Sequence, residues 1–256
     1  MDKQRLEKQR QYKVMDVCLL AGKILLTNGA ETFRVEDTML RMARAFGYAK
    51  CESFVIPTGI IFSLQSVEAE KTKLVRVSQR TTNLLKVTQV NRISRNISQG
   101  NMTIEEAQKA LDEIEQAQET FSTAVQVIAA ALSSACFVFM FQGTWHDFLP
   151  AFLVGGAGFI SFLIVHHLAS VKFISEFMAS VVIAFFSHWL VQIGFGLEID
   201  KIIIASVMPL VPGLLITNAV RDLMVGHLVS GLSKGAEACL TSFAIGAGVA
   251  MVLTIV

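Results

Sequence analysis

The stretch Met208–His227, MPLVPGLLITNAVRDLMVGH, ends an apolar run with side chains that can bind a charged solute. Asn218 and Asp222 are four residues apart, so they share one face of a helix, and Arg221 directly precedes Asp222. A guanidinium is a planar fork that fits a carboxylate, and charged groups beside a membrane span are costly unless they are paired or hydrated. The pattern indicates a passage for a carboxylate or a proton, or else an Arg–Asp pair at the membrane interface that only sets topology.

Two prolines interrupt the same apolar run. Pro209 and Pro212 each remove a backbone donor and disrupt the helix before them, and Gly213 follows. Transporters use broken helices of this kind to aim helix ends at a substrate, whereas a kink near the membrane edge would be structural only. Ser133 and Ser134, in another apolar run, would either line a polar path or bond back to their own helix.

Three ionisable residues are candidates for carrying a coupled proton, namely Asp222, Glu176 and His188. Histidine titrates near neutral pH, and a buried carboxyl group can hold its proton there. Glu176 and His188 differ by about 120° in helical direction, so we expect no direct pair between them. Because His166 and His167 are adjacent, they point apart on a helix and chelate poorly. The sequence predicts no metal site and no cofactor. In the absence of a nucleophile or phosphate-binding motif, it also predicts no catalytic residues.

Charge divides the 256-residue chain into two parts. Residues 1–120 hold 18 of the 22 Lys+Arg and 15 of the 21 Asp+Glu, whereas residues 121–256 hold 4 and 6. The first part is long enough to bury its own core, and the second is apolar enough for lipid. We expect an α+β cytoplasmic domain over 1–120, followed by an all-α transmembrane bundle of about five helices over 121–256. The mild and dispersed positive charge of the first part argues against a nucleic-acid partner.

The first part should contain two helices, a small group of strands and two further helices. The expected ranges are 3–27 and 30–46, then strands 51–58, 59–67 and 74–79, then helices 81–98 and 103–118. Asn28-Gly29 is a helix stop, and Asn28 with Glu31 resembles a capping box for the second helix. Thr103 with Glu106 predicts another capping box. Glu31–Arg34 and Asp37–Arg41 have (i, i+3) and (i, i+4) spacing and are expected to form surface ion pairs.

Apolar runs long enough to cross a bilayer core of about 30 Å follow. Spans are expected over 121–141, 148–165, 173–197, 202–220 and 239–256, with residues 226–238 as a glycine-punctuated connection. Lys172, Arg221 and Lys234 fall in loops on one side, which predicts that this side is cytoplasmic. The charged N-terminus has no apolar signal-peptide core, in agreement with a cytoplasmic first domain. We therefore expect a multi-pass protein of the cytoplasmic (inner) cell membrane, surrounded by lipid.

The chain contains four separated motifs, NGAETFRVEDTMLRMA, IPTGIIFSL, RTTNLLKVTQVNRIS and VPGLLITNAVRDLMVGHLVSGLSKGAEA. The first three resemble the N-terminal domain of the threonine/serine exporter family, and the fourth resembles the end of the same module. The resemblance covers nearly the whole chain with the motifs in order. Carried over by position, the motif residues are Asn28, Gly29, Glu31, Pro57, Thr58, Arg80, Asn83, Pro212, Gly213, Asn218, Arg221, Asp222, Gly226 and Gly231.

This resemblance implies a secondary exporter of small hydrophilic metabolites. Some family members are single long chains, whereas others are split into a larger subunit and a small all-membrane subunit. The present chain stops after its fifth predicted span, as does the larger subunit of the split type, whose implied substrates include dicarboxylates such as succinate. The resemblance thus implies a small all-membrane partner subunit and a small carboxylate substrate, either threonine and serine or a dicarboxylate. A homo-oligomer is also open.

Two other classes of protein remain open on the sequence alone. A membrane-anchored sensory or scaffolding protein would tolerate charge-neutral changes at Asn218 and Asp222. A membrane-anchored, hydrolase-like enzyme would instead gather polar side chains of the first domain in one cleft. The candidates for that cleft are Glu31, Asp37, Thr58, Ser63 and Arg80.

Overall fold

The computed structural model describes residues 2–65, 70–117, 121–169 and 171–256. By its internal packing, the chain divides into two compact units. Unit 1 comprises Met1–Gln118 together with Leu214–Gly235, and unit 2 comprises Glu119–Gly213 and Ala236–Val256. The boundary expected at residue 120 falls outside the described residues. The sequence did not predict that a segment from the apolar half would pack with the polar half.

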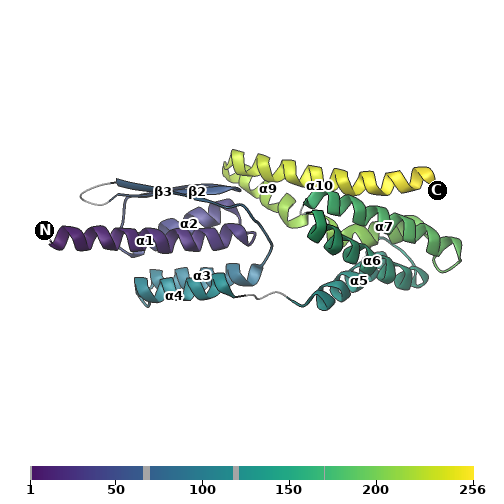
Figure 1. The fold of residues 1–256 in the computed structure, drawn as a ribbon, viewed down its shortest axis with the longest axis horizontal. Helices are drawn as coiled ribbons and strands as arrows, with labels where there is room; N and C mark the ends of the chain where they lie inside the picture. Colours follow the sequence, from purple (N-terminus) through teal and green to yellow (C-terminus); the bar gives the residue numbers. More distant parts are fainter. Residues whose placement is uncertain (1, 66–69, 118–120, 170) are drawn as a thin grey trace. The chain divides into compact units, whose positions relative to one another are not determined.

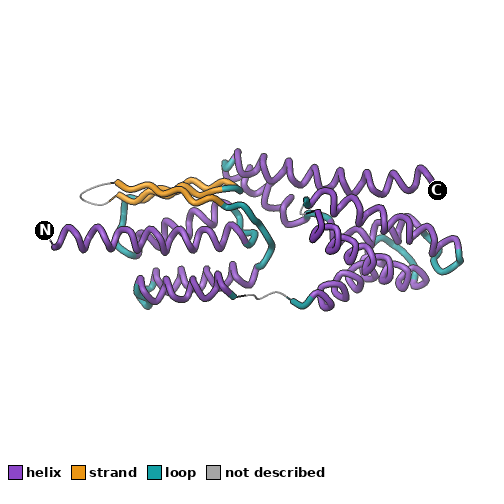
Figure 2. Tube along the Cα trace, viewed as in Figure 1, coloured by secondary structure: helices purple, strands orange, loops and turns teal. Residues whose placement is uncertain are grey.

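Unit 1 is built in layers around a three-stranded antiparallel sheet (Figures 1 and 2). The strands pair in the order β1-β2-β3, and α1 and α2 pack against the sheet while α3 and α4 pack against those two helices. Alternate side chains of the central strand, Ile60, Phe62 and Leu64, are fully buried, as expected for a sheet with one covered face. The bounds are α1 Asp2–Thr27, α2 Thr32–Ala45, β1 Cys51–Ile56, β2 Gly59–Gln65, β3 Glu70–Arg76, α3 Leu84–Ser98 and α4 Ile104–Gln116.

Two local predictions in unit 1 are wrong. The third strand begins at Glu70 rather than at residue 74, because its polar first half pairs with the end of β2 and its lysines contact α1. Lys71 lies over the ring of Tyr12, and Lys73 pairs with Asp16 at 2.6 Å. Such contacts allow a polar segment to form a strand. The last two residues predicted for the second strand lie outside the described residues.

The second wrong prediction concerns the start of α2. Its N-cap is Glu31 and not Asn28, whose side chain donates instead to the Ile24 carbonyl at 2.7 Å. Gly29 adopts a φ of 91°, the left-handed conformation that ends a helix. Asn28-Gly29 therefore ends α1, as predicted, and two more residues are needed before α2 begins. The other predicted capping box, formed by Thr103 and Glu106, is confirmed.

Two helical segments complete unit 1 from the far end of the chain. They are most of α9 (Gly213–Val225) and the first turns of α10 (Leu228–Ile255), joined at Gly226, which adopts a φ of 95°. The expected connection over residues 226–238 is wrong, because α10 is continuous from Leu228. A helix of 28 residues is about 42 Å long and exceeds the bilayer core. The 20 residues from Ala236 to Ile255, which belong to unit 2, are enough for one crossing.

Unit 2 contains helices of membrane length. Four helices of the described chain are long and apolar enough to cross a bilayer: α5 (Thr123–Met140), α6 (Trp145–Ala169), α7 (Lys172–Gln192) and α10. These four helices confirm the prediction of an apolar, helical second half that follows the small sheet in the sequence. The predicted third span ends five residues too late, since Gly194, with a φ of 77°, lies just beyond the end of α7. The fourth predicted span is broken, with α8 (Ile199–Val207), the short helix η1 (Met208–Leu210) and α9 forming a pair bent by 62°.

The glycines of α6 bring its neighbours close. A Cβ on Gly155 would overlap the side chain of Ser134 on α5, and one on Gly158 would overlap Ile183 on α7. Small residues serve this purpose in membrane helices, because no hydrophobic force draws such helices together. The small residues at positions 155–158 therefore mediate close helix packing within this chain.

Candidate functional site

Asp222 lies at the centre of a buried polar cluster in unit 1. Its carboxylate accepts hydrogen bonds from the Thr32 N–H at 3.2 Å, the Thr32 hydroxyl at 2.8 Å and the Lys234 ammonium at 2.7 Å. Lys234 also donates to the Thr32 hydroxyl oxygen at 2.9 Å, and all three residues are buried. Thr32 is the first residue of α2, so Asp222 places its charge at the positive end of that helix. The arrangement satisfies a carboxylate and an ammonium that would be very costly alone.

Asn218 lies one helical turn before Asp222 and extends the same face. Its amide donates to the Gly29 carbonyl at 3.1 Å, and it is buried like Asp222. The shared face predicted from the spacing of Asn218 and Asp222 is thus present, and it packs on the turn between α1 and α2. The loop before α3 joins this turn, because the Asn83 N–H donates to the Asn28 carbonyl at 3.2 Å. Several of the motif residues quoted from the sequence therefore meet at one place.

Arg221 pairs with Glu31 rather than with its neighbour Asp222. Successive residues of a helix point about 100° apart, so Arg221 and Asp222 reach different partners. One Glu31 oxygen contacts the Arg221 guanidinium, and the other accepts from Arg34 Nε at 2.7 Å. The Glu31–Arg34 surface pair expected from (i, i+3) spacing is confirmed, and Glu31 is shared between two arginines.

Glu36 and His227 form the edge of the same region. The Val55 N–H donates to Glu36 at 2.8 Å, His227 Nε2 lies 3.8 Å from the carboxylate, and the Ser230 hydroxyl donates to the Val55 carbonyl at 3.0 Å. Burial raises the pKa of Glu36, while the Val55 N–H and His227 oppose the rise and Asp222 adds to it. These bonds connect β1 to the junction of α9 and α10.

Other predicted residues of unit 1 have structural roles at separate places. Pro57 and Thr58 form the turn between β1 and β2, where the Thr58 carbonyl accepts from the Val77 N–H at 2.9 Å. Asn83 caps α3 through the N–H groups of Leu85 and Lys86. Arg80 lies in the exposed segment before that cap.

The residues of the enzyme alternative are engaged with different partners. Ser63 bonds to Glu70 and Thr72 on the sheet, and Asp37 pairs with Arg41. Glu31 lies between its two arginines. Within the described residues, these three side chains contact different partners, which does not support a single catalytic cleft.

In unit 2, the predicted serines are of two kinds. Ser134 is buried and donates to the Ala130 carbonyl at 2.9 Å, which matches the back-bonding alternative, whereas Ser133 is half-buried. Pro209 lies within η1, Val211 and Pro212 form the break, and Gly213 is the first residue of α9. The Gly213 N–H donates to the Val211 carbonyl at 2.8 Å.

Glu176 is a buried carboxylate in α7. Only 2 % of its side chain is exposed, and Lys172 Nζ lies 3.7 Å from one of its oxygens. Lys172 also lies 3.6 Å from Glu237 on α10. The hydroxyl of buried Thr241 lies next to the Glu176 carboxylate. His188 is half-buried and about 18 Å further along the helix, so the two do not pair, as expected.

Two charged residues of structural importance were missed in the sequence. Lys234 is the cation beneath Asp222, and its only signal was a lone lysine in a glycine-rich apolar run. Asp147, at the start of α6, is fully buried and accepts from the Leu197 N–H at 2.7 Å and the Thr144 hydroxyl at 2.8 Å. Its spacing of three residues from Thr144 was the available signal, since it is the spacing of a local capping pair.

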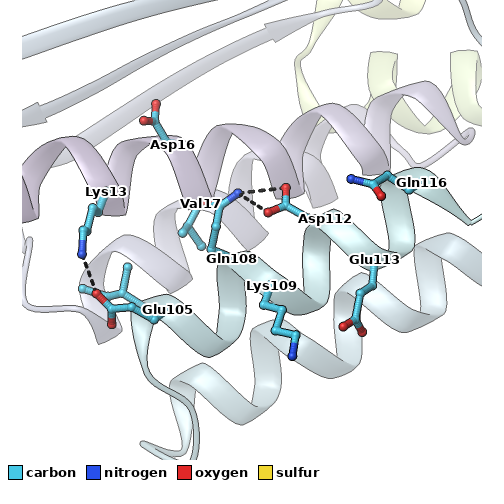
Figure 3. Close-up of a pocket in the computed structure, with 10 residues that line it drawn as sticks. Lys13, Asp16, Val17, Glu105, Gln108, Lys109, Asp112, Glu113 and Gln116 are labelled. Carbon is cyan, nitrogen blue, oxygen red and sulfur yellow. Dashed lines mark hydrogen bonds and ion pairs between the residues drawn. The ribbon is translucent and has the colours of Figure 1, made fainter.

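A cavity of about 460 Å³ lies between α1 and α4 (Figure 3). Lys13 and Glu105 pair across it at 2.8 Å, while Lys109 and Glu113 extend away from α1. Val17 and Ile104 are the apolar residues among those that line it. Among the described residues, no group of three or more His, Cys, Asp or Glu is placed to hold a metal ion.

These features define a multi-pass membrane protein with an α+β unit. The sequence profile of the threonine/serine exporters matches residues 16–256, and the chain belongs to that family. The chain is 28% identical to the "Probable succinate transporter subunit YjjP" of Klebsiella aerogenes, covering 97% of this chain and 96% of that protein. The Escherichia coli protein of the same name is 27% identical, with coverage of 98% and 97%.

The chain also matches about half of a longer relative. The "Threonine/serine exporter" of Corynebacterium glutamicum is 26% identical over 93% of this chain, which covers 50% of that protein. No solved structure matches the chain.

Proposed function

We propose that this chain is one subunit of a secondary transporter that exports small carboxylate-bearing metabolites across the cytoplasmic membrane. Its substrates would be threonine and serine or a dicarboxylate such as succinate, and unit 1 would lie in the cytoplasm. Membership of the exporter family supports transport rather than catalysis. The relatives that match from end to end are named as subunits of a succinate transporter, and the longer relative is named for threonine and serine.

The observation that carries this proposal is the short, broken helical segment formed by α8 and η1. Unit 1 contains residues from both sides of the segment Glu119–Gly213, so with unit 1 in the cytoplasm both ends of that segment would lie on the cytoplasmic side. The segment includes α5, α6 and α7, each long enough for one crossing. An even number of crossings requires a fourth, and α8 with η1 is the remaining apolar helical segment.

That fourth crossing is too short to span the bilayer as a regular helix. α8 and η1 have nine and three residues, which reach about 18 Å against a core of about 30 Å. Irregular backbone at membrane depth is tolerated only beside protein or water. The break at Pro209 and Pro212 is therefore the natural place for a polar passage, with Gly213 and Ser133 as further candidates along it.

Among the three candidate proton carriers, Glu176 is the one we propose. Asp222 is held by three donors from Thr32 and Lys234. Glu176 has a single ion pair, at 3.7 Å to Lys172, and lies next to the Thr241 hydroxyl. The charged groups that face it are Lys172 on its own helix and Glu237 on α10. Protonation of Glu176 would neutralise a costly buried charge. The protonated carboxyl group would then donate a hydrogen bond to the Thr241 hydroxyl.

The test is export from cells loaded with threonine, serine or succinate. The chain would be expressed alone and together with a small all-membrane subunit of the same family. We expect export of at least one of these solutes only when both subunits are present. Export by this chain alone would replace the two-subunit proposal with a homo-oligomer. No export in either condition, with both proteins detected in the membrane, would contradict the proposed function and favour a scaffolding role.

A further inference from the structure

The carboxylate of Glu31 lies between two arginines that come from distant parts of the chain. Arg34, in the first turn of α2, donates to one oxygen at 2.7 Å, and Arg221, on α9, contacts the other. Planar guanidinium forks on both sides of one carboxylate are a geometry that recognises carboxylates in general. The sequence had marked Arg221 alone, and Arg34 only as a surface ion-pair partner.

The two arginines are open to solvent, whereas Glu31 is not. Their side chains are 59 % and 53 % exposed, against 10 % for Glu31. Beneath them, the Asp222 carboxylate is already held by Lys234 and Thr32. The N-terminus of α2 adds its partial positive charge beside the two exposed guanidinium groups. An arriving anion therefore meets exposed donors and a favourable field.

Ion pairs with exposed partners are weak, because water screens them and the side chains lose freedom when held. A free carboxylate offers the arginines the same bonds that Glu31 provides. We propose that Arg34 and Arg221 form the binding site for a carboxylate of the exported metabolite, and that the Glu31 side chain occupies this site when the metabolite is absent. This inference rests on the proposed function and names its recognition site.

The position of the site suits that role. Arg221 lies on α9, which begins directly after the break at Pro212. Exchange of Glu31 for a free carboxylate would release the Arg221 contact between α9 and the start of α2. The buried bonds of Asn218 and Asp222 would remain and keep the helix in place. Binding would thus change one exposed contact without unfolding unit 1.

The experiment is equilibrium binding to the purified full-length chain in lipid nanodiscs. The probes are succinate, L-threonine, the uncharged isostere succinamide and inorganic phosphate, all at one ionic strength. The variants are Glu31→Gln, Arg34→Gln and Arg34→Gln with Arg221→Gln. Arg41→Gln is the matched control, because Arg41 also lies on α2 and pairs with an exposed carboxylate, Asp37. Thermal unfolding of each variant checks that it is folded.

We expect succinate or threonine to bind and succinamide not to bind. Glu31→Gln should tighten carboxylate binding about fivefold, the scale of a competing exposed ion pair. Loss of both arginines should weaken binding at least tenfold, the scale of a lost charge-assisted hydrogen bond, and Arg41→Gln should leave it unchanged. If Arg34→Gln alone folds but the double variant does not, the single variant decides, with a smaller loss expected.

Three results would overturn the site. The first is that the folded arginine variants bind carboxylates as tightly as the natural chain. The second is that Glu31→Gln weakens carboxylate binding. The third is that the protein binds phosphate and none of the carboxylates. A cellular export assay separates this inference from the proposed function. Export with an unchanged KM in the double variant would contradict the proposed binding site and support the proposed transport function. Arginine-dependent binding without export by the two subunits would support the proposed binding site and contradict the proposed transport function.

Discussion

The buried Lys234–Asp222 pair should be the most sensitive electrostatic contact in unit 1. Lys234→Met removes the cation and leaves a buried carboxylate with only the Thr32 donors. We expect a loss of about 3–5 kcal/mol in the free energy of unfolding, the usual cost of breaking a buried pair. Denaturant unfolding of the detergent-solubilised protein measures it. Changing Asp222→Asn as well should restore a large part of that stability, since no charge is then left unpaired.

The control is the solvent-exposed pair Lys13–Glu105, which is 2.8 Å long. Lys13→Met should change the free energy of unfolding far less than Lys234→Met does, because water screens a surface pair. Equal losses in Lys13→Met and Lys234→Met would mean that burial does not strengthen the Lys234 contact.

Glu36 gives a prediction for the pH dependence of stability. Because burial raises its pKa in the folded state, the folded protein holds a proton that the unfolded chain has already released. The resulting stability is present below the unfolded pKa of about 4.3 and is lost as pH rises through the raised folded pKa. Glu36→Gln keeps the acceptor for the Val55 N–H and removes the titration. Its melting temperature relative to the natural chain should therefore rise from pH 4 to pH 7, and a constant difference would contradict the assignment.

Residue spacing predicted the shared face of Asn218 and Asp222 and the Glu31–Arg34 pair, because helical geometry over three or four residues is local. It could not predict that Asp222 binds Thr32, 190 positions away, or that Lys234 completes the cluster. Those partners depend on how α9 and α10 pack on α2, and no local pattern encodes that packing.

At the level of elements, the contact between α9 and α10 depends on Gly231. A Cβ at this position would lie 2.6 Å from Leu223 and 3.0 Å from the Ala219 carbonyl. Gly231→Ala should therefore destabilise the protein by about 1–3 kcal/mol, as overpacking does. Gly235, one turn later in the same helix, has open space around it. Gly235→Ala should be neutral or stabilise by about 0.5–1 kcal/mol, because alanine favours helix.

The two glycine variants are compared by thermal unfolding under identical conditions. Equal effects would show that Gly231 does not mediate a close approach. The comparison also explains a failed prediction. Glycines at 226, 231 and 235 suggested a connection, yet only Gly226 breaks the helix, because at Gly231 tight packing outweighs the low helix propensity of glycine. The amphipathic helices of the first 118 residues were predicted well, since their apolar periodicity is strong.

At the level of the whole molecule, the packing of Leu214–Gly235 in unit 1 has a consequence for topology. Single cysteines introduced at the exposed positions Met224 and Lys8 should be labelled from the same side of the membrane. The four native cysteines would first be replaced, and a membrane-impermeant maleimide applied to intact cells and to inverted vesicles. We expect both positions to react only in inverted vesicles. Labelling from opposite sides would contradict the proposal that α8 and η1 form a fourth membrane crossing.

Hydropathy predicted the membrane-length helices but not this return to unit 1. An apolar helix reads alike along the sequence whether it faces lipid or the surface of another part of the protein. The predicted fourth span, 202–220, therefore ran through the break into α9, most of which packs in unit 1. The family resemblance marked a set of motif residues, and the fold shows which of them contact one another.

Transport in a defined system tests the central claim most directly. Proteoliposomes would contain this chain and a small all-membrane subunit of the family, with radiolabelled succinate or threonine and an imposed pH gradient. The account predicts saturable, gradient-dependent flux above that of empty liposomes, and loss of the gradient dependence in Glu176→Gln. Flux no greater than that of empty liposomes for threonine, serine and succinate, with both proteins folded and inserted, would contradict it.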